Sequence, residues 1–402
     1  MTTGSQKLTF SGLLSSSLRF AALLILCGGG LRAANSSTEP ETASATNRAL
    51  SDALSSERWQ EVEKTVDRAL EWLASQQAAD GSFPTLESGQ PGVTSLAVMA
   101  YLSRGPQPGV GRHGELLDRA IDFVLSCQQA DGLFSKGVPG ETHDSFGPAH
   151  AASYNHAITG LMLGEVYGQV TGERAGKVKQ AIEKGLQWTR RLQLVRIQQK
   201  PPEDRGGWRY LRISSRTDSD LSVTAWQLMF LRSAKNAEFE VPQEWVDEAM
   251  AYVRRCWNPG TGSFGYELRA GRSAADTRGM TGAGILSLSL GGQHRTSMAQ
   301  AAGDWLLAHP YRRFGETIGS SDIFFYSTYY CSQAAAQLGG RHWEDIYPAI
   351  VNVLLQSQSA NGSWPLELGL RGGVERFGQC YTTALAVLSL TPPYQLLPVY
   401  QR

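Results

Sequence analysis

Apolar residues recur along the chain in a pattern that predicts one face of an α-helix. Six segments carry them at relative positions 0, 4, 7 and 8, which is the spacing of a helix with one buried stripe. Polar and charged residues occupy much of the remaining surface of each segment. We therefore expect six amphipathic helices, with apolar patterns that begin at Val62, Leu117, Val178, Trp245, Met298 and Ile346.

Each of these segments runs into a turn that combines glycine with an aromatic residue. Glycine suits a point where the chain leaves a helix with positive φ, and a preceding Asp or Asn favours the same turn. The turns are Asp80-Gly-Ser-Phe83, Asp131-Gly-Leu-Phe134, Gly206-Gly-Trp208, Thr261-Gly-Ser-Phe264, Arg313-Phe314-Gly315 and Asn361-Gly-Ser-Trp364. We expect equivalent turns with positive φ at Gly81, Gly132, Gly262 and Gly362.

A second, less charged helix is expected after each turn, over residues 93–102, 151–166, 221–231, 281–290, 323–338 and 381–390. Few charged side chains over such a length indicate burial on most faces. Six amphipathic outer helices and six apolar inner helices predict an all-α fold across residues 56–402. The expected architecture is an α6/α6 toroid, six helix-hairpin repeats in two concentric rings. An open solenoid is the alternative, and strands are not expected.

The first residues have the pattern of a cleaved secretory signal peptide, which we assign to residues 1–34. The apolar run Phe20–Cys27 follows basic residues, and Leu31–Ala34 offers small residues for cleavage. The run is too short to span a bilayer, which takes about 20 apolar residues. A lipoprotein modified at Cys27 is the second interpretation. Residues 35–55 are expected to form a disordered spacer, so we predict an exported, periplasmic or extracytoplasmic protein.

The charge balance bears on nucleic-acid binding, and the cysteine spacing bears on disulfide bonds. Lys plus Arg and Asp plus Glu both number 37, so the formal net charge is zero. Such a chain lacks the basic excess that a phosphate backbone attracts, and no nucleic-acid partner is expected. The cysteines after the leader show no CxxC spacing, so we expect buried thiols and leave one disulfide pair open. They are Cys127, Cys256, Cys331 and Cys380.

The glycine-aromatic turns resemble the QW repeats of terpene cyclases. The nearest matches are Gln76–Phe83, Gln128–Phe134 and Gln358–Trp364. The likeness covers nearly all of the chain from about residue 60 to residue 395. It implies the squalene-cyclase-like α/α toroid of the terpene cyclase and protein prenyltransferase superfamily. Asp220–Trp226 and the tail Pro392–Gln401 look like those of exported bacterial members of unassigned function.

The resemblance does not extend to a metal site. Phe325–Cys331 looks like the prenyltransferase segment that supplies a zinc-binding histidine, but Ser327 stands at that position. Residues 275–279 lack the expected Asp-x-Cys pair. A zinc ion that activates a thiolate needs about three protein ligands. We therefore expect no metal and no cofactor.

Asp218 and Asp220 are the candidate catalytic residues. They resemble the first two acids of the Asp-x-Asp-Asp motif with which class II terpene cyclases protonate an alkene, and Asp220 is the best candidate proton donor. Leu221 replaces the third acid, and the chain encodes one toroid where such cyclases use two helical domains. The alternative is that Asp220 caps the helix that follows it.

Candidate ligand-binding residues lie on and before two inner helices. Tyr326, Tyr329 and Tyr330 share one helical face, which suits either an apolar cavity or a packed core. Asp276 and Asp322 precede inner helices as Asp220 does. These two acids could bind a ligand at one rim of the toroid, or they could cap the N-termini of the helices that follow them.

These features support three functions and leave open whether the protein is an enzyme. The first is a toroid that binds a hydrophobic isoprenoid or lipid in a central cavity, with acid-initiated isomerase or lyase chemistry if it is catalytic. The second is a non-catalytic extracytoplasmic scaffold or protein-binding module, with a second subunit or domain as its partner. The third is a secreted glycan-active α/α barrel. A tyrosine-lined cavity would favour the first, a filled centre the second, and an open cleft with paired acids the third. No transmembrane span is expected.

Overall fold

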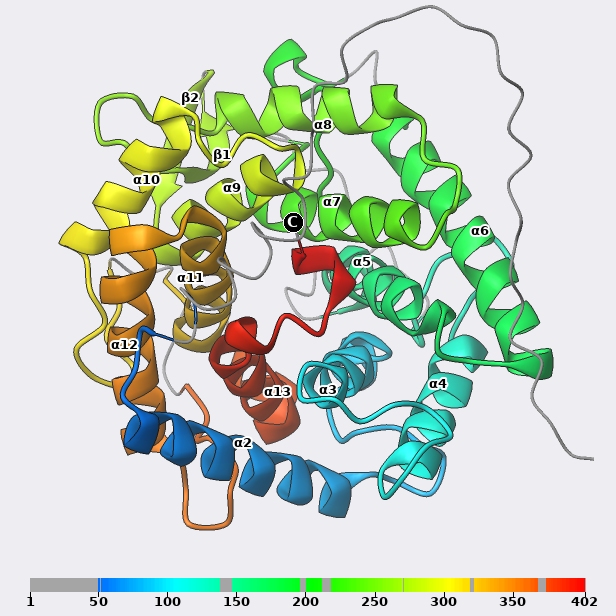
Figure 1. Cartoon of the computed structure of the whole chain (residues 1–402). Coiled ribbons are helices and arrows are strands. Elements are labelled where there is room, and N and C mark those ends of the chain that lie inside the picture. Colours follow the sequence, from blue (N-terminus) through cyan, green and yellow to red (C-terminus); the bar gives the residue numbers. More distant parts are fainter. Residues whose placement is uncertain are drawn as a thin grey trace, which may run out of the picture.

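The computed structural model describes residue 50 and residues 52–137, 147–195, 200–211, 218–269, 271–318, 322–367 and 374–401. Over these residues two concentric rings of helices surround a common centre (Figure 1). The outer ring holds α2 (Ser56–Gln76), α4 (Gly114–Ser126), α6 (Gly172–Leu194), α8 (Gln243–Arg255), α10 (Ser297–Ala308) and α12 (Gly340–Ser357). The inner ring holds α3 (Gly92–Leu102), α5 (Pro148–Tyr167), α7 (Leu221–Asn236), α9 (Arg278–Leu290), α11 (Phe324–Leu338) and α13 (Gly378–Leu390). The predicted α/α toroid is confirmed.

The two rings differ in burial as their compositions predict. Outer helix α4 buries Leu117, Ile121 and Val124 on one face and exposes Glu115 and Asp122 on the other. Every residue of inner helix α3 is buried. The chain alternates between the rings, so the inner helices run in one direction. Their N-termini therefore lie at one end of the ring, which we call the N-terminal end, and their C-termini lie at the other.

The predicted turn glycines all have positive φ: +90° at Gly81, +98° at Gly132, +82° at Gly262 and +95° at Gly362. A glutamine that precedes the turn ties it to the next outer helix. Nε2 of Gln77 donates to the backbone carbonyl of Leu116 in α4 at 2.9 Å. Nε2 of Gln128 donates to that of Ala181 in α6, also at 2.9 Å. The QW-like motifs therefore join neighbouring outer helices.

The same contact closes the ring. Nε2 of Gln358, which follows α12, donates to the carbonyl oxygen of Thr65 in α2 at 2.9 Å. Helix α13 packs against both α2 and α3, and α12 packs against α2. The last helices thus bury the flank of the first ones, and the open solenoid is excluded.

The closing turn provides a stability test. A Cβ atom at Gly362 would lie 2.6 Å from the carbonyl oxygen of Arg68 in α2, whereas Gly292, also at positive φ (+74°), has no atom within 4 Å of such a Cβ. We expect Gly362→Ala to lower the free energy of unfolding by about 2 kcal/mol, from backbone strain and the displaced helix together. Gly292→Ala, which adds strain alone, should cost about 1 kcal/mol. Urea denaturation of both variants measures the difference, and equal losses would contradict the close approach.

A short β-hairpin is a feature that the sequence did not predict. Strands β1 (Gly265–Arg269) and β2 (Arg272–Asp276) pair antiparallel, with Glu267 opposite Ala274, between α8 and α9. The expectation of no strands was wrong here, because five-residue strands are too short to give a clear alternating pattern. The hairpin carries Tyr266 and Glu267 to the N-terminal end of the ring.

Other connections are short 3-10 helices: η1 (Glu87–Gly89), η2 (Pro202–Asp204), η3 (Val374–Phe377), η4 (Pro392–Tyr394) and η5 (Pro398–Tyr400). The four predicted thiols, Cys127, Cys256, Cys331 and Cys380, are buried and free, so the open question of a disulfide pair is answered for them. In the part of the chain that the structure describes, no helix combines the length and apolarity that a bilayer span requires. The predicted leader 1–34 and most of the spacer 35–55 lie outside the described residues.

Candidate functional site

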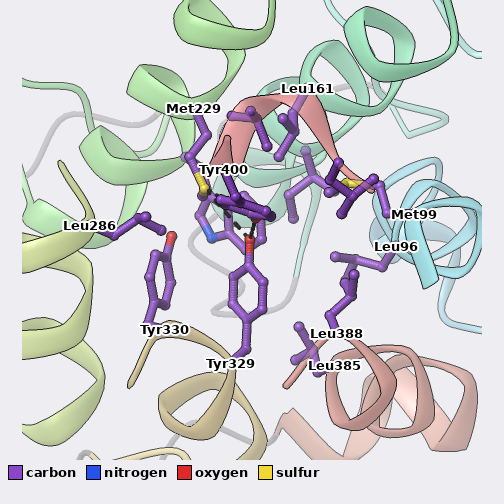
Figure 2. Packing of buried hydrophobic residues seen from close by; sticks show 14 of the residues in the cluster. Leu96, Met99, Leu161, Met229, Leu286, Tyr329, Tyr330, Leu385, Leu388 and Tyr400 are labelled. Atoms are coloured by element: carbon purple, nitrogen blue, oxygen red, sulfur yellow. Dashed lines mark hydrogen bonds between the residues drawn. The ribbon is translucent and has the colours of Figure 1, made fainter. Parts of the chain in front are cut away.

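The centre of the inner ring is filled by the tail, which we define as residues 391–401. It leaves α13 and crosses the middle of the ring (Figure 1). Figure 2 shows Tyr400 among apolar side chains of the inner helices, and its hydroxyl is hydrogen-bonded to that of Tyr329. Tyr329 and Tyr330 have no exposed surface, and Tyr329 stacks on Trp226 with ring centroids 5.4 Å apart. These two predicted ligand residues are therefore core residues in this state.

The N-terminal end of the ring carries a group of half-buried aromatic side chains, which we call the aromatic rim. It consists of His150, Tyr154, Tyr210, Tyr266 and Tyr326. The His150 ring stacks on Tyr210 with centroids 3.8 Å apart. Of the predicted tyrosines, only Tyr326 belongs to this rim.

Hydrogen bonds organise the hydroxyl groups of the aromatic rim. Tyr154 donates to Oγ of Ser222 at 2.9 Å, and Ser222 is hydrogen-bonded to the Tyr326 hydroxyl at 2.5 Å. The hydroxyls of Tyr210 and Tyr266 bond to each other. Ser222 stands on the first turn of α7, so the start of this helix brings α5 and α11 together at the rim.

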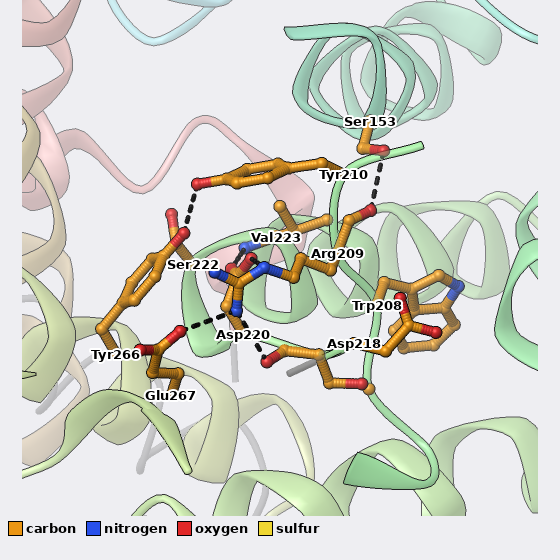
Figure 3. Close-up of polar contacts among 12 residues, drawn as sticks. Ser153, Trp208, Arg209, Tyr210, Asp218, Asp220, Ser222, Val223, Tyr266 and Glu267 are labelled. Carbon is orange, nitrogen blue, oxygen red and sulfur yellow. Dashed lines mark hydrogen bonds and ion pairs between the residues drawn. The ribbon is translucent and has the colours of Figure 1, made fainter. Parts of the chain in front are cut away.

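Asp220 lies immediately behind the rim and caps α7. Its Oδ1 accepts a hydrogen bond from the backbone N–H of Val223 at 2.8 Å, as the N-cap interpretation predicts. Its Oδ2 lies 3.9 Å from Nε of Arg209, and Nη1 of Arg209 lies 2.9 Å from Oε2 of Glu267 (Figure 3). One guanidinium thus joins two carboxylates, and it also packs over the rings of Tyr210 and Tyr266, with distances of 5.2 and 5.5 Å to the centroids.

Burial sets the charge state of Asp220. The side chain has no exposed surface, and burial raises its pKa to about 6, although the Arg209 charge and the Val223 N–H favour the ionised form. The group holds Arg209 and the start of α7.

Asp218 does not join Asp220 in an acid pair. Its backbone N–H donates to Oδ2 of Asp204 at 2.6 Å, and Figure 3 shows its carboxyl group pointing in a different direction from that of Asp220. The interaction partner of Asp220 is Arg209.

The expected parallel between Asp276 and Asp220 is wrong. Thr277 caps α9, with its Oγ1 accepting from the N–H of Met280 at 3.1 Å. Asp276 instead accepts from Oγ of Ser263 at 2.7 Å and from Nδ2 of Asn258 at 3.2 Å, within the turn that follows α8. Its carboxylate holds that turn together.

Asp322 also has a different role from the predicted N-cap. Ile323 occupies the N-cap position of α11, and no side chain caps this helix. Oδ2 of Asp322 lies 2.8 Å from Nε of Arg278, and the two side chains are 0% and 1% exposed. The pair is a buried ion pair between α9 and the segment before α11, so Asp322 is unavailable to a ligand at the rim.

Sequence reasoning missed His150 and Tyr154, which lie on α5. It also missed Arg209, Tyr210, Tyr266 and Glu267, which lie in non-helical segments where the helical pattern carries no signal. The sequence offered one signal: a charged residue stands next to a tyrosine in two successive connections, at Arg209-Tyr210 and Tyr266-Glu267. Only the fold brings these pairs together.

The prenyltransferase zinc position holds no metal-binding group. Ser327 is buried and its Oγ donates to the carbonyl oxygen of Phe324 at 2.9 Å. Among the residues that the structure describes, no cluster of three or more His, Cys, Asp or Glu side chains is placed to hold a metal ion.

Comparison with known proteins places the fold. Residues 16–188 match the model of the prenyltransferase alpha-alpha toroid domain. No curated protein matches the sequence. An inactive variant of the GH76A α-1,6-mannanase of Salegentibacter sp. HEL1_6, in complex with α-1,6-mannotriose, is similar with a TM-score of 0.58 at 10% identity. The match covers 83% of this chain and 99% of that chain.

A second similar structure is a variant of the type II terpene cyclase MstE of Scytonema, in complex with its substrate geranylgeranyl dihydroxybenzoate. Its TM-score is 0.53 at 15% identity, over 86% of this chain and all of that chain (100%). At these identities the likeness concerns the fold. Together with the family model over residues 16–188, the QW-like turns and the closed double ring, it supports a terpene cyclase and prenyltransferase-like α/α toroid.

Proposed function

We propose that the protein is an exported, non-catalytic binding protein that takes a carbohydrate on the aromatic rim. The observation that carries this proposal is the rim itself, where half-buried aromatic side chains surround hydroxyls already ordered by Ser222. Aromatic faces pack against the C–H faces of sugar rings, and phenol and serine hydroxyls exchange hydrogen bonds with sugar hydroxyls. A site that combines both kinds of contact suits a polyhydroxylated ligand.

The charged residues behind the rim favour binding over catalysis. A proton donor to an alkene must reach the substrate, whereas the Asp220 side chain has no exposed surface and faces Arg209. Glycoside hydrolysis takes two carboxyl groups that flank the scissile bond. Asp220 and Glu267 instead flank one guanidinium, with side chains 0% and 9% exposed. These acids support the rim from behind.

The central cavity that an isoprenoid would require is occupied in this state. Tyr400 and the side chains around it fill the centre of the inner ring. The aromatic rim is therefore the better candidate site while the tail is in place.

Two tyrosines on the same helix test the proposal. Tyr154 lies at the N-terminal end of α5, on the rim, and Tyr167 lies at the opposite end of α5; both are half-buried. We expect Tyr154→Ala to weaken binding at least tenfold, because it removes a ring face and the hydrogen bond to Ser222. Tyr167→Ala is the matched control and should bind as the wild type does. Calorimetry with α-1,6-mannotriose, preceded by an oligosaccharide array, provides the measurement.

The oligosaccharide array and one enzyme assay can each contradict the proposal. Absence of binding to every saccharide, or equal affinity in the Tyr154 and Tyr167 variants, would remove the rim as a sugar site. Turnover of geranylgeranyl dihydroxybenzoate by the wild type would replace it with a cyclase function.

Export is part of the proposal and has its own test. Loss of the signal peptide would leave a mature chain that begins near residue 35, since small residues precede that point. N-terminal sequencing of the protein from its native host is expected to find this end in an extracytoplasmic fraction. A cytoplasmic protein that retains Met1 would contradict export.

A further inference from the structure

We propose that a proton holds the end of the tail in place: the protonated carboxyl group of Glu165 fixes residues 397–401, and its ionisation loosens them. We call Glu165, with its contacts to Ser233 and Val399, the proton latch. It lies at the C-terminal ends of the inner helices, at the opposite end of the ring from the aromatic rim. The inference is therefore independent of the proposed sugar site.

Glu165 connects the tail to two inner helices. It stands near the C-terminal end of α5 and is 4% exposed. Its Oε2 accepts from the backbone N–H of Val399 at 3.3 Å, and its Oε1 lies 2.5 Å from Oγ of Ser233 in α7. One carboxyl group thus joins α5, α7 and the tail.

The contacts of Ser233 place a proton on this carboxyl group. Oγ of Ser233 also lies 3.2 Å from the carbonyl oxygen of Leu161. A serine hydroxyl has one hydrogen and can donate it to only one of the two oxygens. Both contacts are hydrogen bonds when Glu165 is protonated, because its O–H then donates to Ser233 and Ser233 donates to Leu161. Burial favours the same form, since it raises the pKa of Glu165 to about 7.

The groups that face Glu165 offer its carboxylate no counter-charge. Helix α7 presents a serine, and α11 and the tail present the phenols of Tyr329 and Tyr400, which burial keeps neutral by raising their pKa values. Helix α3, which also packs against α5, contains no charged residue. The charged side chains at the start of α6 are held in ion pairs on the outside of the ring, Arg174 with Asp122 and Lys177 with Glu173. An ionised Glu165 is therefore unfavourable while the tail covers it.

The end of the tail can move without opening the ring. Two side-chain amides also hold its backbone: Nδ2 of Asn236 donates to the carbonyl oxygen of Pro398 at 3.0 Å, and Nε2 of Gln337 donates to that of Tyr400 at 2.7 Å. Ring closure instead depends on α2, α12 and α13. Local opening at a chain end costs less free energy than global unfolding.

The direction of the pH effect follows from the cover that the tail provides. Val399 and Tyr400 contact Glu165, so their departure admits water, and the solvated carboxyl group then ionises near its usual pKa of 4.5. Opening therefore releases a proton between about pH 4.5 and pH 7, and the open fraction rises with pH over this window. Burial of Leu397 and Val399, which are 4% and 1% exposed, keeps the closed form dominant.

Amide hydrogen exchange of the full chain, followed by mass spectrometry between pH 5.5 and pH 8, tests the proton latch. The protection factor removes the intrinsic pH dependence of exchange and reports how often a segment opens. We expect the protection of residues 397–401 to fall by about tenfold or more over this range. Helix α12 should stay more strongly protected at each pH, because the ring remains closed.

Two variants separate the proton from the other tail contacts. Glu165→Gln keeps both hydrogen bonds and cannot ionise, so its tail should be equally protected at every pH. Asn236→Ala removes an anchor that does not titrate, and it should lower the protection while the pH dependence of the wild type remains. Circular dichroism establishes that both variants are folded.

Three results would overturn the proposal. They are wild-type protection that is constant with pH, a Glu165→Gln tail that loses protection as the wild type does, and a tail that exchanges as slowly as α12. The last result would mean that the tail opens only when the whole ring unfolds. If Glu165→Gln does not fold, the wild-type profile decides.

Discussion

Replacing Asp322 with alanine is expected to lower the free energy of unfolding by about 3–5 kcal/mol. Asp322 and Arg278 form an ion pair with a distance of 2.8 Å between Nε and Oδ2, and both side chains are almost without exposed surface. The Arg278 guanidinium also packs over the Tyr311 ring, 4.0 Å from its centroid. The alanine variant would leave this charge in the interior without its counter-charge, and burying an uncompensated ion is strongly unfavourable.

Two further variants make this result specific to the buried pair. Glu173→Ala removes the exposed partner of Lys177 on α6 and should leave the urea midpoint nearly unchanged, because exposed pairs contribute little. The double variant Asp322→Ala with Arg278→Met should lose less stability than the sum of its single changes, since no unpaired charge remains. Simple additivity in this cycle would mean that the two side chains do not interact.

The variant Glu165→Gln is expected to gain stability relative to the wild type as the pH rises. Glu165 is 4% exposed; it accepts from Oγ of Ser233 at 2.5 Å and from the N–H of Val399. Burial raises its pKa from 4.5 to about 7, against these two hydrogen bonds. Tyr329 and Tyr400 are the titratable neighbours, and burial keeps both phenols neutral by raising their pKa values.

The stability of the wild type falls with rising pH because the folded protein and the unfolded chain bind different numbers of protons at Glu165. Below about pH 4.5 the carboxyl is protonated in both states, and above about pH 7 it is ionised in both. In between, the unfolded chain ionises while the folded protein keeps its proton, so wild-type stability falls by about 3 kcal/mol as the pH rises. A glutamine cannot ionise, and its oxygen and nitrogen can bond Val399 and Ser233 respectively.

Urea denaturation of both proteins at pH 4.5 and pH 7.5 measures this effect. Other carboxyl groups titrate alike in the two proteins and cancel in the difference. We expect that difference to favour Glu165→Gln by about 3 kcal/mol more at the higher pH. A constant difference would show that Glu165 titrates in the folded protein as it does in the unfolded chain.

The fold followed from the sequence because the repeated signals act locally. The apolar stripe at Leu117, Ile121 and Val124 defines a helix face by itself, and Gly362 marks a turn through its own backbone preference. Gln358 was part of a recognisable motif, and that motif closes the ring. These features need no knowledge of distant residues.

The candidate site depends on contacts between segments, which a local pattern cannot define. The sequence indicated Asp220 because this residue precedes a helix, and it also predicted that Asp220 caps that helix. Its partner Arg209 lies in the loop before that helix, and Glu267 lies on a hairpin too short to be predicted. Tyr400 stands in a proline-containing tail with no periodicity, so nothing local indicated that it enters the ring.

Ring closure affects the order in which the protein folds during synthesis. The hydrogen bond from Gln358 to Thr65 joins positions 293 residues apart. During synthesis α2 is made first, but the flank that it presents to α12 and α13 stays uncovered until the final hairpin has emerged. Bringing such distant segments together carries a large entropic cost, and late contacts of this kind prolong the exposure of apolar surface. Nascent chains that stall before residue 340 should therefore be the form that most needs a chaperone.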